Sequence, residues 1–261
     1  TAALSGSSKT ALMRRYGARI NPDNLAHDSG LRVLMACVAR TAAKHGRVAK
    51  PLLSVWDSHH LRISVKISKS IEGANQVEKS LGWRIKEPNE KEVVASMEEG
   101  LTPQSSTDSL PMHCFLPLSY PINRQDKRIS GPLWIAPLGD SEVMANFTEE
   151  EVVTMCTTEY FKENPMNWSE RDFEIEKRKI VRCIKNIKNE SEIIEGEFLI
   201  LTDDLASWRN VGSPPSPKKM VSKINEKGFK AALSHYPKPS FRTNAPWEVI
   251  IEVLEETQPP M

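Results

Sequence analysis

The strongest constraint on the fold is a change of hydrophobic periodicity near residue 46. Upstream of it, apolar residues recur at helical spacing, which predicts an amphipathic helix over about residues 28–45. Downstream, residues 61–67 alternate between apolar and polar side chains, as a half-buried strand does. A second apolar run covers residues 52–55. We therefore expect two antiparallel strands that are joined near residues 57–60.

The last quarter of the chain has a second informative pattern. It predicts a strand over 199–201, a helix over 203–209, a proline turn over 213–217, a helix from Ser216 to Gly228, strands over 229–233 and 240–243, and a helix over about 244–256. Helix, tight turn, helix and hairpin is the order of a winged helix. The same order also occurs in helical domains that bind no nucleic acid.

The middle of the chain is less regular. Residues 70–86 predict a turn and a short helix, and residues 87–128 predict a long loop or a degraded small module. Two prolines bracket an apolar stretch at 131–138, which indicates an edge strand or a turn. Capping boxes predict helices from Thr148 to about Phe161 and from Ser169 onward.

Composition excludes several classes of protein. The 261 residues are 39% hydrophobic and 26% charged, which is typical of a globular chain with two modest cores and not of a disordered one. The longest uncharged apolar runs are much shorter than the roughly 18 to 20 residues that span a bilayer. Thr1 is not a methionine and no signal peptide follows it, so we expect the chain to begin inside a longer protein.

The net charge of +1 hides a segmental pattern. Residues 1–69 carry 12 Lys and Arg against 3 Asp and Glu, and residues 214–244 carry 7 against 1. Residues 70–213 carry 16 against 26. Two basic segments around an acidic middle indicate two surfaces that contact one phosphate backbone. The alternative is that they are ordinary solvated faces.

These basic segments contain the candidate RNA-binding residues. One group is a cationic run with an aromatic neighbour, suited to phosphate contacts and base stacking. The other lies on the second helix and hairpin of the predicted winged helix, where it would contact the RNA backbone without reading sequence. The candidates are Arg14, Arg15, Arg19, Lys218, Lys219, Lys223, Lys230, His235, Lys238, Arg242 and Thr243.

Glycine and cysteine spacing argue against cofactor and metal sites in this chain. The 12 glycines are never closer than 8 residues, so no Gly-x-Gly loop or P-loop is present. The 4 cysteines form no C-x-x-C pair, and three of them lie in apolar helical patterns. We therefore expect free thiols in a reducing, cytoplasmic compartment.

Several segments resemble the tRNA guanine-N2 dimethyltransferases that modify the guanine at tRNA position 26. TAALSG followed by LMRRYGA is similar to the family segment after the fifth strand of the methyltransferase sheet. The stretch from HDSGLRVLMACVAR to LRISVKI resembles the helix and antiparallel strand pair that complete that sheet. GPLWIAPL and KGFKAALSHYPKPSFRTNAPWEVI resemble a family-specific block and the C-terminal hairpin and helix. Together these matches cover about half of the chain.

The resemblance implies an α/β fold: the C-terminal end of a doubly wound, Rossmann-like methyltransferase sheet, followed by an α+β domain with a winged-helix-like unit. We expect residues 1–70 to be the tail of the methyltransferase domain and 71–130 to be a linker or degenerate zinc-module region. Residues 131–261 would be a tRNA-binding domain, with the winged-helix-like unit at about 198–256.

The function implied by the resemblance is transfer of methyl groups from S-adenosylmethionine to guanine N2. The family's glycine-rich cofactor loop and D-P-F-G motif lie upstream of the segment that opens this chain, so we expect a C-terminal fragment with no catalytic or cofactor-binding residues. Its partners would be tRNA and the missing N-terminal half, with no membrane or DNA. Alternatives are a noncatalytic RNA-binding subunit of a split or decayed methyltransferase and, less well supported, a transcriptional winged-helix protein.

One departure from the family concerns zinc. Many relatives carry a four-cysteine zinc module before the GPLW block. Here His113 and Cys114 resemble its first member, but residues 115–129 contain no second cysteine. One thiol cannot hold zinc, so we predict no metal.

Overall fold

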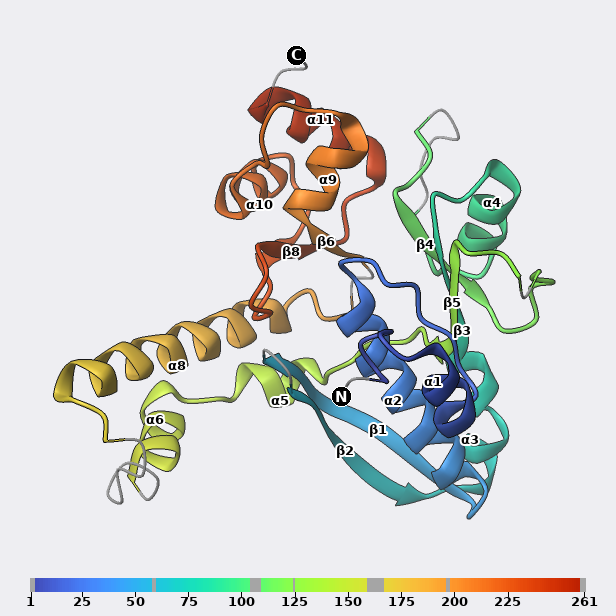
Figure 1. Cartoon of the computed structure of the whole chain (residues 1–261), viewed down its shortest axis with the longest axis horizontal. Coiled ribbons are helices and arrows are strands. Elements are labelled where there is room, and N and C mark those ends of the chain that lie inside the picture. The colour runs from blue at the N-terminus through green and yellow to red at the C-terminus, as the bar shows by residue number, and fades with distance from the viewer. Residues whose placement is uncertain are drawn as a thin grey trace.

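The chain folds into helices packed around small antiparallel sheets (Figure 1). The computed structural model describes residues 3–57, 60–103, 109–123, 125–158, 167–195 and 198–258. Within these ranges the sheets have two, three and three strands, and every strand pairing is antiparallel. The protein is therefore of mixed α/β type. None of its described helices has the length and hydropathy needed to cross a membrane.

The N-terminal part confirms both elements predicted from periodicity. Its elements are α1 (Lys9–Tyr16), α2 (Ala26–Ala43) and the antiparallel strands β1 (Arg47–Asp57) and β2 (His60–Lys69). Helix α2 approaches the preceding chain very closely at Gly30. A Cβ atom on Gly30 would lie 2.2 Å from the carbonyl oxygen of Leu4, so only glycine permits this packing.

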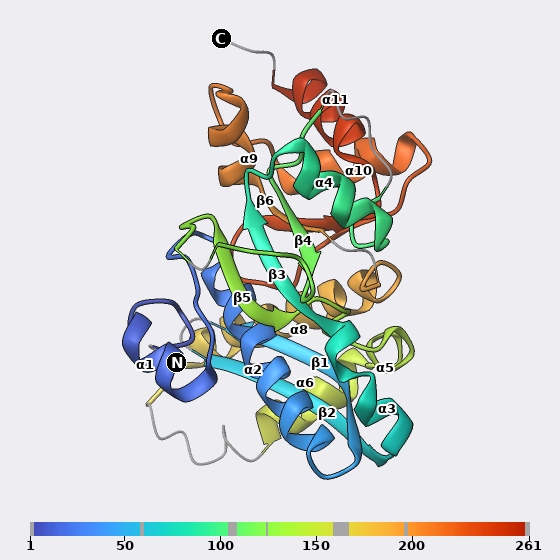
Figure 2. The same ribbon diagram turned by 90° about the vertical axis from the view of Figure 1, so that its right-hand side faces the viewer.

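A second sheet occupies the stretch whose periodicity is weak. Its strands lie in the order β4-β3-β5. The elements are α3 (Ile71–Asn75), the 3-10 helix η1 (Val77–Ser80), β3 (Leu81–Lys86), α4 (Glu90–Glu98), β4 (His113–Pro117) and β5 (Ile129–Trp134). Figure 2 shows β3 between its two neighbours, with α4 beside them.

These elements correct the expectation of a loop over residues 87–128. Helix α4 begins at a capping box formed by Asn89 and Glu92, and β4 pairs along β3. Short strands with few alternating residues left little periodicity to detect. Strand β5 is an edge strand, as Pro132 indicated, and it crosses the boundary predicted between residues 130 and 131.

Within the described residues, three helices connect this sheet to the C-terminal unit. They are α5 (Ser141–Ala145), α6 (Glu149–Thr158) and α8 (Glu170–Ser191). Helix α8 begins at the predicted capping box, in which Ser169 and Asp172 exchange side-chain and backbone hydrogen bonds. Helix α6 starts next to Thr148 as predicted, but residues 159–161 of that prediction lie outside the described residues.

The C-terminal unit contains the elements predicted from the last quarter of the sequence. They are β6 (Phe198–Leu201), α9 (Thr202–Arg209), α10 (Pro217–Glu226), β7 (Ala231–Leu233), β8 (Ser240–Thr243) and α11 (Trp247–Thr257). The sheet order is β6-β8-β7, and α9, α10 and α11 enclose one apolar core with Phe241 and Trp247 at its centre, both fully buried.

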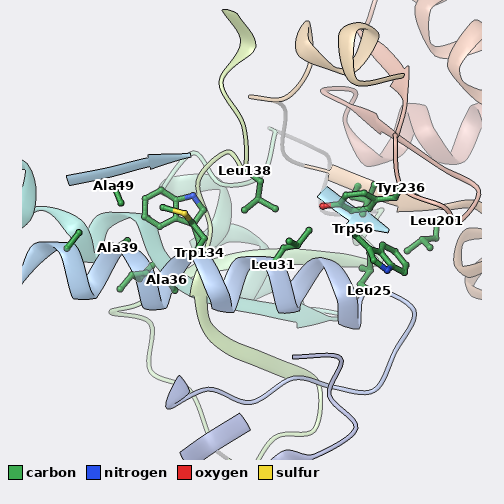
Figure 3. Packing of buried hydrophobic residues seen from close by; sticks show 14 residues of the cluster. Leu25, Leu31, Ala36, Ala39, Ala49, Trp56, Trp134, Leu138, Leu201 and Tyr236 are labelled. Atoms are coloured by element: carbon green, nitrogen blue, oxygen red, sulfur yellow. The ribbon is translucent and has the colours of Figure 1, made fainter. Parts of the chain in front are cut away.

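A continuous hydrophobic core joins the C-terminal unit to the N-terminal part. Figure 3 shows Leu25 and Leu31 of the α2 region packed with Trp56 of β1 and with Leu201 and Tyr236 of the C-terminal unit. Trp56 and Tyr236 meet edge to face with ring centroids 5.4 Å apart. The two ends of the chain therefore share one core.

A buried network of charged side chains lies beside this core. The carboxylate of Glu190 at the end of α8 accepts hydrogen bonds from Arg242 of β8 and from the ring of His235. His235 Nε2 also lies 3.0 Å from the carbonyl oxygen of Ser54 in β1. Both ring nitrogens of His235 thus face hydrogen-bond acceptors.

Asp28 of α2 extends the network to the N-terminal part. Its carboxylate accepts from Arg32 Nε at 2.8 Å and from the Tyr236 hydroxyl at 3.1 Å, and lies 3.9 Å from Arg242. Burial raises the pKa of Glu190, but the charges of His235 and Arg242 outweigh that effect and lower it to about 2. The network therefore stabilises the junction in its ionised form.

Replacement of Glu190 should change the response to acid. The folded-state pKa is below its ordinary value of 4.5, so the stabilisation is present above pH 4.5 and is lost as pH falls towards 2. This depression corresponds to about 3 kcal/mol. We expect Glu190→Gln to lower the free energy of unfolding at pH 7 by about 3–5 kcal/mol, because it leaves buried cations without their carboxylate.

Urea unfolding between pH 7 and pH 2.5 measures this effect. The wild type should lose more stability across the acid range than E190Q does. Glu78→Gln, at an exposed glutamate of η1, is the matched control and should follow the wild type. Parallel profiles for E190Q and the wild type would contradict the assignment.

Candidate nucleic-acid interface

Helix α8 separates its charges along its length. Acidic residues occupy its first two turns, and six of the twelve residues from 177 to 188 are Lys or Arg, with no Asp or Glu among them. Acidic groups near a helix N-terminus and basic groups towards its C-terminus are both favoured by the helix dipole. The second half of α8, residues 177–188, is therefore strongly basic.

A groove of about 480 Å³ lies between the basic half of α8 and the C-terminal unit. Val181 and Leu233 contribute apolar surface to it, and Asn186 donates a hydrogen bond to the carbonyl oxygen of Ser234 that ties α8 to the hairpin. The cationic residues that line the groove are Lys177, Arg178, Arg182 and Lys185 of α8 and Lys218 of α10. Glu174 is the single acidic residue among the described residues that line it.

Among the described residues, the cations that line the groove form only weak, exposed ion pairs, so they can still bind an added anion. Lys177 lies 4.0 Å from Glu174 and Lys185 lies 3.6 Å from Glu149, but both pairs are exposed. Exposed ion pairs of this kind contribute at most about 1 kcal/mol and are readily exchanged for another anion. Arg178 and Arg182 are exposed on the same helix. A phosphate backbone would find several cations within one groove.

The predicted lysines of the second helix of the C-terminal unit, α10, differ in their surroundings. Lys218 and Lys219 are exposed on the first turn of α10, and Lys218 lines the groove. Lys223 is one turn further along and forms an ion pair with Glu226 at 3.1 Å. The structure thus brings Lys218 together with cations of α8 that are 33 to 41 residues earlier in the chain.

The predicted lysines of the hairpin region lie elsewhere. Lys230 is exposed before β7, where its backbone N–H donates to Asn244. Lys238 reaches from the hairpin to the N-terminal part, because its Nζ donates to the side-chain oxygen of Asn24 at 2.8 Å. Neither residue lines the α8 groove.

Three predicted RNA-binding residues are corrected by the structure. His235 and Arg242 are 8% and 2% exposed and are engaged with Glu190 in the buried network. Thr243 is fully buried, and its hydroxyl donates to the carbonyl oxygen of Lys230 at 2.8 Å. All three connect elements of the fold and are buried. Their hydrogen-bonding side chains suggested surface contacts only because sequence does not show burial.

The predicted arginines near the N-terminus form a separate basic region. Arg14 and Arg15 are exposed on α1, and Arg19 is half-buried beside a cavity of about 290 Å³ that Lys9, Lys86 and Lys127 also line. Figures 1 and 2 show α1 and α8 apart, on different sides of the molecule. The structure does not merge the two basic regions into one patch.

The described residues offer no metal site. None of their His, Cys, Asp and Glu side chains form a group of three or more that could hold a metal ion. Cys114, which resembles the first member of a zinc module, is fully buried in β4, and burial raises the pKa of its thiol to about 12. Cys114 is a packing residue in this structure.

The basic half of α8 is the feature that the sequence analysis missed. The charge count over residues 70–213 averaged its six cations with many acidic residues elsewhere in that segment. A window limited to residues 177–188 contains only basic charges and would have found it.

Comparisons with known proteins agree on one family. The family model described as N2,N2-dimethylguanosine tRNA methyltransferase matches residues 1–255. Three archaeal relatives named tRNA (guanine(26)-N(2))-dimethyltransferase match 97–98% of the chain. They come from Thermoplasma volcanium (24% identical), Aeropyrum pernix (26%) and Thermococcus kodakarensis (27%), and the chain covers 55%, 54% and 55% of their lengths.

A solved structure has the same fold. It is described as a complex of Trm1 from Pyrococcus horikoshii with S-adenosyl-L-methionine, and it aligns with a TM-score of 0.67 at 20% identity. The alignment covers 97% of this chain and 56% of that one, so the chain spans about half the length of the relatives that it matches. The match over residues 1–255 establishes that the chain belongs to the N2,N2-dimethylguanosine tRNA methyltransferase family.

Proposed function

We propose that this chain supplies tRNA-binding surface to a tRNA guanine-N2 dimethyltransferase that acts at position 26. The observation that carries the proposal is the groove between α8 and α10, in which cations from two distant segments converge in a member of this family. Backbone contacts of this kind position RNA and carry little sequence information. Guanine would be selected by other groups of the enzyme.

The S-adenosylmethionine site and the catalytic groups would lie outside these 261 residues. This part of the proposal is supported by the absence of any Gly-x-Gly loop from the sequence and by a length about half that of the relatives. Methylation of guanine N2 also requires the base to leave its stack and enter a pocket. The chain would contribute by holding the tRNA while groups elsewhere act on it.

We also propose the winged-helix-like organisation for residues 198–256. The order of β6, α9, α10, β7, β8 and α11 supports it, and so does the sheet order β6-β8-β7, which places the hairpin beside the short first strand. In this arrangement the first turn of α10 presents Lys218 and Lys219 outward. The unit would contact RNA through that turn and not through the buried face of its hairpin.

The isolated 261 residues should show no methyl transfer. We expect no label above background on tRNA that is incubated with the chain and methyl-labelled S-adenosylmethionine, because no cofactor loop is present. Turnover by the isolated chain would contradict the proposed placement of the catalytic groups.

Removing the two groove arginines should weaken tRNA binding and reduce its salt dependence. Each cation that neutralises a phosphate contributes about 0.7–0.9 to the slope of log K against log salt. We therefore expect Arg178→Ala with Arg182→Ala to reduce this slope by up to about two. Filter binding at salt concentrations from roughly 50 to roughly 300 mM, around the physiological value, measures it.

The double variant Lys179→Ala with Lys188→Ala is the matched control. It removes two charges from the same helix, at positions that do not line the groove. Its slope should stay near the wild-type value. Equal slopes for the wild type and the arginine variant would show that the groove is an ordinary solvated face.

A further inference from the structure

A second cavity lies where the N-terminal part, the β4-β3-β5 sheet and the C-terminal unit meet. It has a volume of about 500 Å³, which is within the usual range for small-ligand sites. Its walls combine an aromatic ring, carboxylates and cations, supplied by Asp23, Arg84, Lys86, Asp204, Ser207 and Trp208. None of these residues has a part in the α8 groove.

Arg84 is a buried cation in the wall of this cavity. It is 2% exposed, its Nε donates to Ser29 at 2.9 Å, and its Nη2 donates to both oxygens of Asp23 at 2.8 and 3.0 Å. Its Nη1 is buried without a hydrogen-bond partner among the described residues. Buried polar atoms normally have a partner, so this guanidinium nitrogen is an unsatisfied donor in a residue of the cavity wall.

Another part of the wall belongs to α9. The indole of Trp208 is half-buried and is held edge to face against the fully buried Trp247, with ring centroids 5.7 Å apart. Asp204 lies one turn earlier and accepts a hydrogen bond from the side-chain amide of Asn24 through one of its oxygens. The cavity therefore offers a fixed aromatic ring next to a carboxylate acceptor.

This cavity adjoins the basic cavity near α1. The two share Pro22, Asp23 and Lys86 in their linings. The neighbouring cavity adds the cations Lys9, Arg19 and Lys127. We call the two adjoining cavities together the combined groove. One end of it is cationic, and the other end carries an aromatic ring together with hydrogen-bond donors and acceptors.

We propose that this combined groove binds one unpaired nucleotide of the tRNA, apart from the backbone contacts at α8. The phosphate lies at the cationic end, and the base lies against Trp208 with its exocyclic amine donating to Asp204. Aromatic rings beside cationic grooves are how proteins hold unstacked bases. The proposal rests on the proposed tRNA-binding function. It predicts a preference for bases with an exocyclic amine, so uridine nucleotides should bind most weakly.

The test uses a variant that fills the cavity with a larger side chain and keeps the aromatic ring of Trp208. Ser207 is exposed and lines the cavity, so Ser207→Phe should block it while Trp208 stays in place. Ser213→Phe, at an exposed turn residue of the same unit that lines none of the three cavities described, is the matched control. Circular dichroism melting should give both variants the wild-type transition.

The probes are guanosine, cytidine and uridine 5′-monophosphates and unmodified tRNA. Saturation-transfer NMR measures the binding of each mononucleotide, with and without tRNA as a competitor. The wild type and S213F should bind the guanosine and cytidine nucleotides more tightly than the uridine nucleotide, and tRNA should displace them. S207F should lose this binding and should bind tRNA about 5- to 160-fold more weakly, the range that one stacked base contributes.

Two results would overturn the proposal: no mononucleotide bound to the wild type at millimolar concentration, or equal binding by S207F and the wild type. Mononucleotides that tRNA cannot displace would show a free-nucleotide site and would also overturn it. Failure of the proposed function is separate, because it would appear as an absence of salt-dependent tRNA binding by the wild type.

Discussion

The buried contact of Glu190 with His235 and Arg242 is the interaction on which the arrangement of this chain depends. It joins the end of α8 to the C-terminal hairpin, and through Asp28 and the Ser54 carbonyl it also joins α2 and β1. Removing one partner would leave charges buried without compensation, which is much more costly than losing an exposed pair. Elements from both ends of the chain are therefore held in one geometry.

That geometry makes both binding surfaces possible. Because Glu190 fixes the end of α8 beside the hairpin, the basic half of the helix lies next to the first turn of α10, and Lys218 joins its cations in one groove. The same junction places residues of α9 and Arg84 in the wall of the second cavity, which is lined by parts of the chain more than a hundred residues apart. Both proposed sites are products of tertiary packing.

The sequence predicted local elements better than it predicted the site. Periodicity located α2, the β1-β2 pair and the C-terminal unit, because each buries one regular face. It missed α4, β3 and β4, which are short and whose pairing is set by distant strands. Arg242 and His235 were assigned to RNA because a basic side chain on a hairpin has no sequence signal that distinguishes a buried ion pair from an exposed one.

Lysine acetylation footprinting with mass spectrometry can locate the tRNA on the surface of this chain, since it reads each lysine separately with and without tRNA. We expect tRNA to protect Lys177, Lys185 and Lys218 together, because all three line one groove. Lys66 and Lys91, exposed on β2 and α4, should stay equally reactive. Unchanged reactivity at the three groove lysines, or equal protection at all five positions, would contradict it.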